Sequence, residues 1–268
     1  MKHNNILSTN NVKTLKGGKF GYITYIAYLS PFKDNSKGIN ICSHASEGCA
    51  KACLFSSGYG GMFDTVKNGR RARTEYFLSD RKGFLFQLKD EIDRALRLNE
   101  GKAIVTIRLN GTSDLPYEKF KVFEGNKNIF EMFPKVIFYD YTKNHTRFLK
   151  ELPKNYHLTF SRSETNHEKA MELLSKGISV AMVFDKTPKK YEGYKVIDGD
   201  ISDLRFKDGK GVIVGLKYKK MTEKGSDNSL AFKSGFAIKV KVEEIIKRYT
   251  KVISKIKGKK KVKKSLAV

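Results

Sequence analysis

A strand–helix–strand unit in the second half of the chain constrains the fold more than any other feature of the sequence. Residues Tyr156–Phe160 form a short apolar and aromatic run, as a buried strand does. Thr165 and Glu168 have the spacing of a helix-capping box, and the helix that follows is predicted to end at Gly177. Another apolar run, Val180–Phe184, begins directly afterwards. A helical crossover between two strands implies that the strands pair in parallel.

The same alternation of strands and helices extends over most of the chain. Apolar spacing typical of helices occurs in Thr65–Leu78 and Arg81–Leu98. Runs rich in β-branched and aromatic residues predict further strands at Gly21–Ser30, Ala103–Leu109, Val136–Tyr141, Tyr194–Ile197 and Val212–Leu216, with Phe236–Val240 as an additional candidate. Seven or eight such strands in 268 residues predict an α/β fold, a (β/α) barrel that is complete or partial and forms one domain over residues 1–240. An open doubly wound sheet is the alternative, although no GxGxxG motif follows the first strand and no Walker loop occurs.

The chain is strongly basic, with 53 Lys and Arg residues against 28 Asp and Glu residues and a formal net charge of +25. Eleven basic and two acidic residues lie from Lys241 onward, where we expect a basic amphipathic helix over Val242–Ile256 and a disordered tail over Lys257–Lys264. These residues, 241–268, form the second region of the chain. A positive field of this size attracts polyanions, so DNA or RNA is an expected partner. The alternative is that the charge serves only solubility.

The sequence also bears on where the chain works. No apolar run approaches the ~20 residues that a membrane-spanning helix needs. The N-terminal residues lack the apolar region of a signal peptide. We therefore expect no contact with a membrane and a location in the cytoplasm, where thiols stay reduced.

Three cysteines, the only ones in the chain, lie within twelve positions at Cys42, Cys49 and Cys53. An odd number of clustered thiols in a polar, glycine-containing loop is typical of a metal or iron–sulfur site rather than of disulfides. A [4Fe–4S] cluster held by three cysteines would leave one iron open to a small molecule. A zinc site with His44 as fourth ligand is a second interpretation, although His44 follows Cys42 too closely to complete a tetrahedron easily. The third interpretation is that the three thiols bind no metal.

Polar residues follow the predicted strands at the ends where parallel α/β proteins carry their sites. The second strand leads into Asn110-Gly111-Thr112-Ser113-Asp114, five small residues in a row. The third ends in an aromatic run that contains a carboxylate, Asp140, next to Tyr141. Ser161 and Glu164 follow the fourth. We expect these side chains to lie near the cysteine loop, which follows the first strand.

A three-cysteine loop after the first strand of a (β/α) barrel resembles the radical S-adenosylmethionine (SAM) superfamily. The spacing here, Cys42-x6-Cys49-x3-Cys53, departs from the CxxxCxxC of that superfamily. The resemblance implies that the three cysteines ligate a [4Fe–4S] cluster and that SAM binds its open iron. It also implies that residues 110–114 contact the SAM amino group and that Ser161 and Glu164 contact its ribose. Asp140 and Tyr141 are then the candidates for the substrate side.

The chain also resembles an uncharacterised family of tailed-bacteriophage proteins that carry a cysteine motif of this spacing. The segments that carry this resemblance include Thr14-Leu-Lys-Gly-Gly, Leu109-Asn-Gly-Thr-Ser-Asp, Phe138-Tyr-Asp-Tyr-Thr-Lys and Gly211-Val-Ile-Val-Gly-Leu-Lys. It covers roughly residues 12–217. The resemblance implies expression in the cytoplasm of a bacterial host and carries no activity with it.

Two functions follow as expectations. The first is an iron–sulfur, radical-SAM-like enzyme that acts on a nucleic-acid or phosphorylated substrate. The second is a non-enzymatic nucleic-acid-binding protein in which an iron–sulfur or zinc site stabilises the structure. A zinc-dependent hydrolase is less favoured, because the clusters of histidines and carboxylates that it needs are absent from the sequence.

Overall fold

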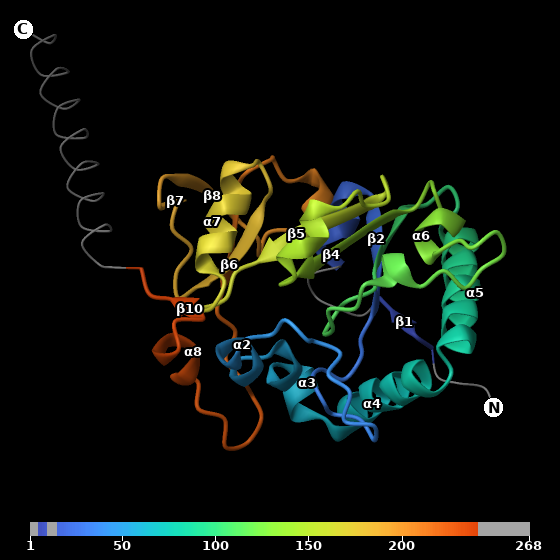
Figure 1. The fold of residues 1–268 in the computed structure, drawn as a ribbon, viewed down its shortest axis with the longest axis horizontal. Helices are drawn as coiled ribbons and strands as arrows, with labels where there is room; N and C mark the ends of the chain where they lie inside the picture. The colour runs from blue at the N-terminus through green and yellow to red at the C-terminus, as the bar shows by residue number, and fades with distance from the viewer. Residues whose placement is uncertain (1–4, 10–14, 241–268) are drawn as a thin grey trace, which may run out of the picture.

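The computed structural model describes residues 5–9 and 15–240, which form an α/β structure around one sheet (Figure 1). The sheet has ten strands in the order β1-β2-β3-β4-β5-β6-β9-β8-β7, with β10 paired to β6. All neighbours from β2 to β8 along this order are parallel, and the short strands β1 and β7 pair antiparallel at the two edges. The predicted basic helix and tail at 241–268 lie outside the described residues.

The strands are β1 (Leu7–Ser8), β2 (Tyr22–Ala27), β3 (Ile104–Arg108), β4 (Ile137–Thr142), β5 (Tyr156–Ser161), β6 (Val180–Phe184), β7 (Lys190–Tyr191), β8 (Tyr194–Asp198), β9 (Ile213–Lys217) and β10 (Ala237–Ile238). The α-helices are α2 (Glu47–Lys51), α3 (Tyr59–Met62), α4 (Asp64–Ser79), α5 (Arg81–Asn99), α6 (Ile129–Met132), α7 (His167–Ser175) and α8 (Leu230–Lys233). Five 3₁₀ turns complete the elements, namely η1 (Lys16–Phe20), η2 (Leu54–Ser56), η3 (Tyr117–Lys119), η4 (His145–Leu149) and η5 (Arg205–Lys207).

Every strand predicted from the sequence is present, and the predicted parallel pairing is confirmed. The crossover β5–α7–β6 has the expected order, and Ala237–Ile238 is the additional strand. Closure into a complete barrel is not observed, because within the described ranges no pairing joins the edge strands β1 and β7. The sheet is open, so the predicted barrel is not confirmed.

The expected capping box before α7 is also not formed. The helix begins at His167, and its N-cap Asn166 accepts no hydrogen bond from the first turn. Asn166 Oδ1 instead accepts a hydrogen bond from the amide of Ser163. The loop after β5 therefore uses this side chain to shape its own turn.

The larger hydrophobic core lies between α5 and the first half of the sheet. On α5, Phe84, Leu88 and Ile92 have no exposed surface and recur at helical spacing. They pack in one cluster with residues of β2, β3 and β4, among them Ile107 and Phe138. Figure 1 shows α5 along one side of this half of the sheet. Since each fully buried side chain of this kind contributes about 1.5–3 kcal/mol, this helix fixes the position of the first strands.

A second cluster lies around β6 and contains Phe160 of β5 with Leu173 and Leu174 of α7. β5 and β6 pair over only two positions, Phe160↔Val180 and Ser161↔Ala181. Further along β6, β10 pairs with Val183 and Phe184. The C-terminal segment of the described chain thus returns to the middle of the sheet, next to the end of β5.

The N-terminal strand β1 is held by a buried carboxylate rather than by apolar contacts alone. Glu91 of α5 is 8% exposed, and its two oxygens accept hydrogen bonds from the amides of Ile6 and Leu7 at 2.8–3.0 Å. Gln87 Nε2 also donates to this carboxylate at 2.8 Å. These bonds satisfy backbone groups that an edge strand of two residues leaves unpaired.

We predict that Glu91→Gln lowers the free energy of unfolding by about 1–3 kcal/mol, because an amide nitrogen replaces one of the oxygens that face backbone N–H groups. Urea denaturation followed by far-UV circular dichroism measures the change. Asp90→Asn is the matched control, since the Asp90 side chain is 76% exposed and should change stability by less than about 0.5 kcal/mol. Equal effects of the two substitutions would contradict this role of Glu91.

Candidate functional site

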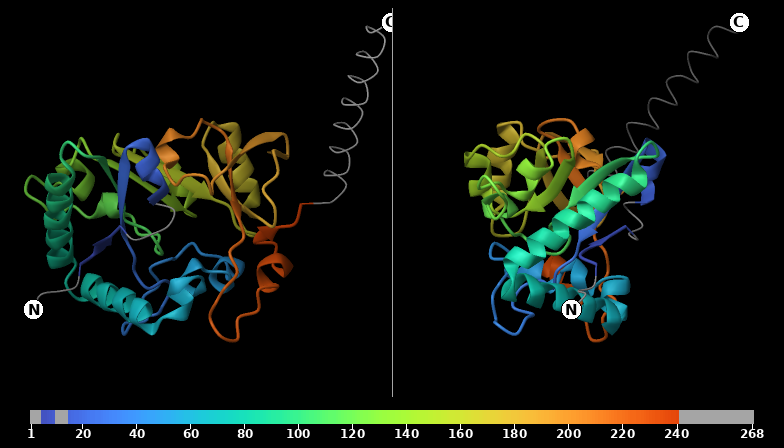
Figure 2. Two further views of the ribbon diagram at one scale, coloured as in Figure 1. Left: turned by 180° about the vertical axis from the view of Figure 1, so that it is seen from behind. Right: turned by 90° about the vertical axis from the view of Figure 1, so that its right-hand side faces the viewer.

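The cysteine loop lies at the carboxyl edge of the parallel strands, as the sequence predicts. It follows β2 and is bound to the loop after β3 by the amide of Asp114, which donates to the carbonyl of Ile41 at 3.0 Å. The Cys42 thiol lies 3.5 Å from the carbonyl oxygen of Thr112. Figures 1 and 2 show α2, α3 and α4 below this edge of the sheet. The carboxyl ends of β2 and β3 thus meet the loop that carries all three thiols.

Glu164 connects α2, the helix that contains Cys49, to the loop after β5. Its carboxylate accepts hydrogen bonds from the Ser46 hydroxyl at 2.8 Å and from the amide of Gly48 at 2.7 Å. Gly48 is needed for this contact, because a Cβ atom there would lie 2.7 Å from a carboxylate oxygen of Glu164. Ser46 is also the N-cap of α2 and accepts a hydrogen bond from the amide of Cys49. In this structure Glu164 therefore positions the cysteine loop.

The three thiols are partly buried and electrostatically coupled. Burial raises the pKa of Cys42 to about 12 and that of Cys53 to about 11, and the charge of Cys49 contributes to both shifts. The amide of Phe55 donates to the Cys53 sulfur at 3.5 Å. Within the described part of the chain, no three His, Cys, Asp or Glu side chains are grouped closely enough to hold a metal ion. The thiols share one region of the structure, yet their sulfurs do not converge on one point.

His44, which the zinc interpretation names as the fourth ligand, contacts its own neighbour in the chain. Its side chain is exposed, and its Nδ1 atom lies 3.0 Å from the Ser43 hydroxyl. It belongs to no metal-holding group among the described residues. The structure gives the zinc interpretation no support beyond the thiols themselves.

Residues 110–114 form a tight turn that is bonded largely to itself and to β2. Asn110 Oδ1 accepts hydrogen bonds from the Ser113 hydroxyl and the amide of Leu115, both at 2.8 Å. The Thr112 hydroxyl donates to the carbonyl of Leu29. A Cβ atom at Gly111 would lie 2.7 Å from Ile26 and 2.8 Å from the carbonyl oxygen of Ala27. Glycine at this position allows the loop after β3 to approach β2.

Asp114 and Ser161 join the loops after β3, β4 and β5. Asp114 accepts a hydrogen bond from the amide of Lys143 at 2.9 Å and forms an ion pair with Arg147 at 3.3 Å. The Lys143 ammonium donates to the Ser161 hydroxyl at 2.6 Å and lies 5.6 Å from the ring centroid of Phe236. Two predicted site residues, from the ends of β3 and β5, are therefore brought together at one edge of the sheet through Lys143, which the sequence analysis did not single out. This edge, with the cysteine loop and the loops after β3, β4 and β5, is called the rim.

Asp140 lies within the sheet itself and has no exposed surface. β3 and β4 pair over only two positions. Beyond these positions, the Asp140 carboxylate accepts hydrogen bonds from the amides of Leu109 and Asn110 at 3.1 and 3.0 Å. The Tyr156 hydroxyl donates to it at 3.3 Å. The carboxylate thus replaces a backbone partner where the strands separate. Burial raises its pKa to about 6, against the lowering effect of Arg108.

Tyr141 belongs to a polar cluster around Asp203. Arg108 pairs with Asp203 at 2.6 Å, and the Tyr141 hydroxyl lies 3.4 Å from the same carboxylate. Burial raises the pKa of Tyr141, so this hydroxyl is protonated at neutral pH. Asp203 is separated from Tyr141 by 62 residues, and only the fold reveals this partner.

Sequence reasoning missed Arg70, which lies on α4 beside the cysteine loop. Arg70, Thr74 and Phe77 are the buried residues of this helix, at positions i, i+4 and i+7. The charge of Cys53 is among those that act on Arg70. An arginine at a core-facing position of a helix was the available sequence signal.

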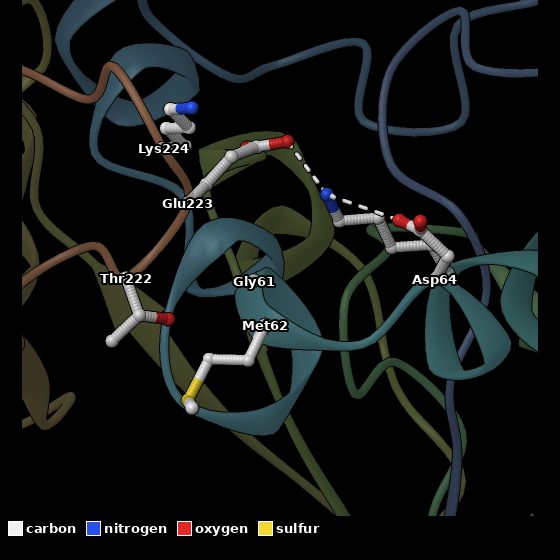
Figure 3. Close-up of a pocket in the computed structure, with 7 residues that line it drawn as sticks. Gly61, Met62, Asp64, Thr222, Glu223 and Lys224 are labelled. Atoms are coloured by element: carbon white, nitrogen blue, oxygen red, sulfur yellow. Dashed lines mark hydrogen bonds and ion pairs between the residues drawn. The ribbon is translucent and has the colours of Figure 1, made fainter.

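A separate open pocket of about 460 Å³ lies between α3, the start of α4 and residues 222–224 (Figure 3). Lys67 bridges Glu223 at 2.7 Å and Asp64 at 4.0 Å across it. Met62 and Thr222 also line the pocket, and no cysteine does. We therefore place the candidate site at the thiol-bearing rim rather than here.

The family model for gene product 88 matches residues 2–238 of the chain. The chain belongs to the gene product 88 family, a family of phage type. The matched region of the gene product 88 family contains all three cysteines, Arg70 and every strand of the sheet, and it ends before the basic residues from Lys241 onward. Neither the curated proteins nor the solved structures include one that matches this chain. No described helix combines the length and apolar character needed to cross a membrane.

We predict that Gly111→Ala destabilises the protein by about 1–3 kcal/mol, because the new methyl group would overlap the carbonyl of Ala27. Gly18→Ala is the matched control, since a Cβ atom there meets nothing within 4 Å. Thermal unfolding compares the two variants. Equal melting temperatures would contradict the close approach of this loop to β2.

The raised pKa of Asp140 predicts a pH dependence of stability. Well below pH 4 the carboxyl is protonated in both the folded and the unfolded state, whereas above about pH 7 it is ionised in both, and ionisation disfavours the folded state. The free energy of unfolding of the wild type, minus that of Asp140→Asn, should therefore fall by roughly 2–3 kcal/mol between pH 4 and 7. Urea denaturation across this range measures the difference, and a constant value would contradict the prediction.

Proposed function

We propose that the chain is an iron–sulfur protein whose three cysteines hold a [4Fe–4S] cluster, and that it is a radical-SAM-like enzyme acting on a nucleic-acid or phosphorylated substrate. The observation that carries the proposal is the position of the loop that bears the three thiols at the carboxyl edge of a parallel sheet, where it is bound to the loops after β3 and β5. This edge is where parallel α/β proteins usually carry their chemistry. In this proposal the open sheet is a partial (β/α) barrel.

The chemistry of the donor set fits a thiolate-ligated cluster. An N–H donor to the Cys53 sulfur is typical of such sites, where hydrogen bonds to sulfur tune the cluster. Arg70 and Lys143 supply positive charge that lowers the pKa of Cys53, although burial outweighs them. Since burial favours the protonated thiols of Cys42 and Cys53, and the three sulfurs do not converge, loading must release protons and bring the loop 42–53 together. When bound, a cluster of this kind supplies an electron and one open iron that ligates SAM.

The other residues of the rim have positioning and binding roles in this proposal. Glu164 holds α2 against the loop after β5, and Asp140 keeps β3 and β4 apart where the turn 110–114 begins. That turn and Ser161 border the place where SAM would lie, with Gly111 allowing the turn to pack on β2. Tyr141 is assigned to the substrate side. Each assignment is part of the proposal and follows the location of the residue at or near the carboxyl ends of β3, β4 and β5.

A second candidate is a nucleic-acid-binding protein in which the cysteine site has a structural role. The observation that favours it is the net charge of +25, spread over the body of the chain as well as its end. Because binding through Lys and Arg releases counterions, such a protein would bind DNA or RNA with a strong dependence on salt. It would not consume SAM.

Anaerobic reconstitution with iron and sulfide tests the proposal. We expect visible absorption and close to four irons per chain in the wild type, and loss of most of this iron in Cys49→Ala, because three thiolates are the minimum for the cluster. Ser43→Ala is the control, since Ser43 is an exposed neighbour in the loop that carries no thiol. Incubation with SAM and dithionite should then release 5′-deoxyadenosine.

The outcomes separate the candidates. Colourless protein that binds zinc would exclude the iron–sulfur proposal. Full iron in Cys49→Ala would contradict the three-ligand site. A stable cluster that yields no 5′-deoxyadenosine, together with salt-dependent binding of DNA or RNA, would favour the structural role.

A further inference from the structure

Arg70 is a buried cation to which no described residue supplies a counter-charge. Its residue is 9% exposed, and its Nη1 atom is buried with no hydrogen-bond partner among the described residues. An arginine remains charged in any protein environment, so it does not escape the cost of burial by losing its proton. A buried charge without a counter-charge destabilises a fold. The fold therefore keeps an expensive group beside the thiols.

Each of the other buried arginines has an ion-pair or hydrogen-bond partner. Arg147 pairs with Asp114 and Glu118, and Arg205 pairs with Asp208. Arg162 donates to the carbonyls of Gly235 and Phe236. For Arg70, the described residues provide neither a carboxylate nor a carbonyl.

What Arg70 does contact is aromatic. Its guanidinium carbon lies 5.0 Å from the ring centroid of Tyr28 and 5.4 Å from that of Phe55. Such contacts hold a guanidinium through its face. They orient the group but leave its N–H edge unsatisfied, and that edge is the part that binds a carboxylate or a phosphate in two parallel hydrogen bonds.

A second cation lies near the same loop. The Lys143 ammonium lies 5.6 Å from the ring centroid of Phe236, which packs in one cluster with Cys49 and Ala52. Arg70 lies over the ring of Phe55, whose amide donates to the Cys53 sulfur. Lys143 makes no ion pair with any described carboxylate, and its ammonium donates to the Ser161 hydroxyl. Two positive side chains from α4 and the end of β4 thus flank the cysteine loop.

We propose that Arg70 and Lys143 form a binding site for an anionic group, a carboxylate or a phosphate, of the molecule on which the thiol-bearing rim acts. The identity of this molecule as a substrate rests on the proposed function, whereas the binding itself requires no cluster. The guanidinium edge binds two oxygens of the anion, and the ammonium binds from the other side. The aromatic rings of Tyr28 and Phe55 keep the guanidinium in place while the site is empty.

Calorimetric titration of the metal-free full-length protein with inorganic phosphate, and separately with acetate, tests the site. We expect the wild type to bind at least one of the two, and Arg70→Met to lose at least tenfold in affinity. Arg71→Met is the matched control, because Arg71 is the next residue of the same helix but is half exposed and paired with Asp34 at 2.6 Å. It removes the same charge and should leave the affinity within twofold of the wild type.

The ratio of the phosphate to the acetate affinity distinguishes the two anion types. Without ligand, Arg70→Met should melt at or above the temperature of the wild type, since a buried unpaired charge has been removed. The proposal would be overturned if Arg70→Met bound phosphate and acetate with the same affinities as the wild type. It would also be overturned if the wild type bound neither anion.

Lys143→Met gives an independent reading if Arg70→Met does not fold. It should weaken anion binding at least fivefold, whereas Lys67→Met, which removes a lysine paired with Glu223, should not. Equal anion affinities of these two variants would overturn the proposal. Iron content after reconstitution is measured on the same proteins, so that failure of the cluster and failure of the anion site are seen separately.

Discussion

Parallel pairing from β2 to β6 is the constraint on which the rest of this structure depends. In parallel strands every carboxyl end lies at the same edge, so the loops after β2, β3, β4 and β5 must meet there. The meeting loops satisfy one another through polar side chains, among which Glu164 and Asp114 each bind a backbone amide of another loop. The thiols owe their common location to this edge rather than to contacts of their own.

The rim combines well-satisfied carboxylates with poorly satisfied cations. Asp140, Asp114 and Glu164 each accept at least two hydrogen bonds or ion pairs, and so they act as fixed parts of the scaffold. Arg70, by contrast, is held by aromatic rings and keeps an unused N–H donor. A scaffold that satisfies its anions and leaves a buried cation open is suited to bind an anion from outside.

Particular elements show how far sequence reasoning reaches. The strands and the crossover through α7 were predictable because apolar periodicity and β-branched runs are local signals. The capping box at Thr165 failed because Asn166 instead binds the amide of Ser163 within the same loop. Asp140 was identified as unusual, but its burial at the separation of β3 and β4 depends on where the ladder between them ends. The unpaired state of Arg70 could not be predicted, because its sequence neighbours do not show that no carboxylate of the described residues reaches it.

The sequence by itself determined the alternation of strands and helices, the concentration of three thiols in one loop and the excess of positive charge. Only the tertiary structure decided that the sheet stays open, that β10 returns to β6 and that Glu164 lies against the amide of Gly48, 116 residues away. It also decided that Arg70 is buried where no residue of the described ranges supplies a counter-charge. The reason is that burial and charge pairing are properties of space, set by residues far apart in the chain, whereas periodicity is a property of neighbours.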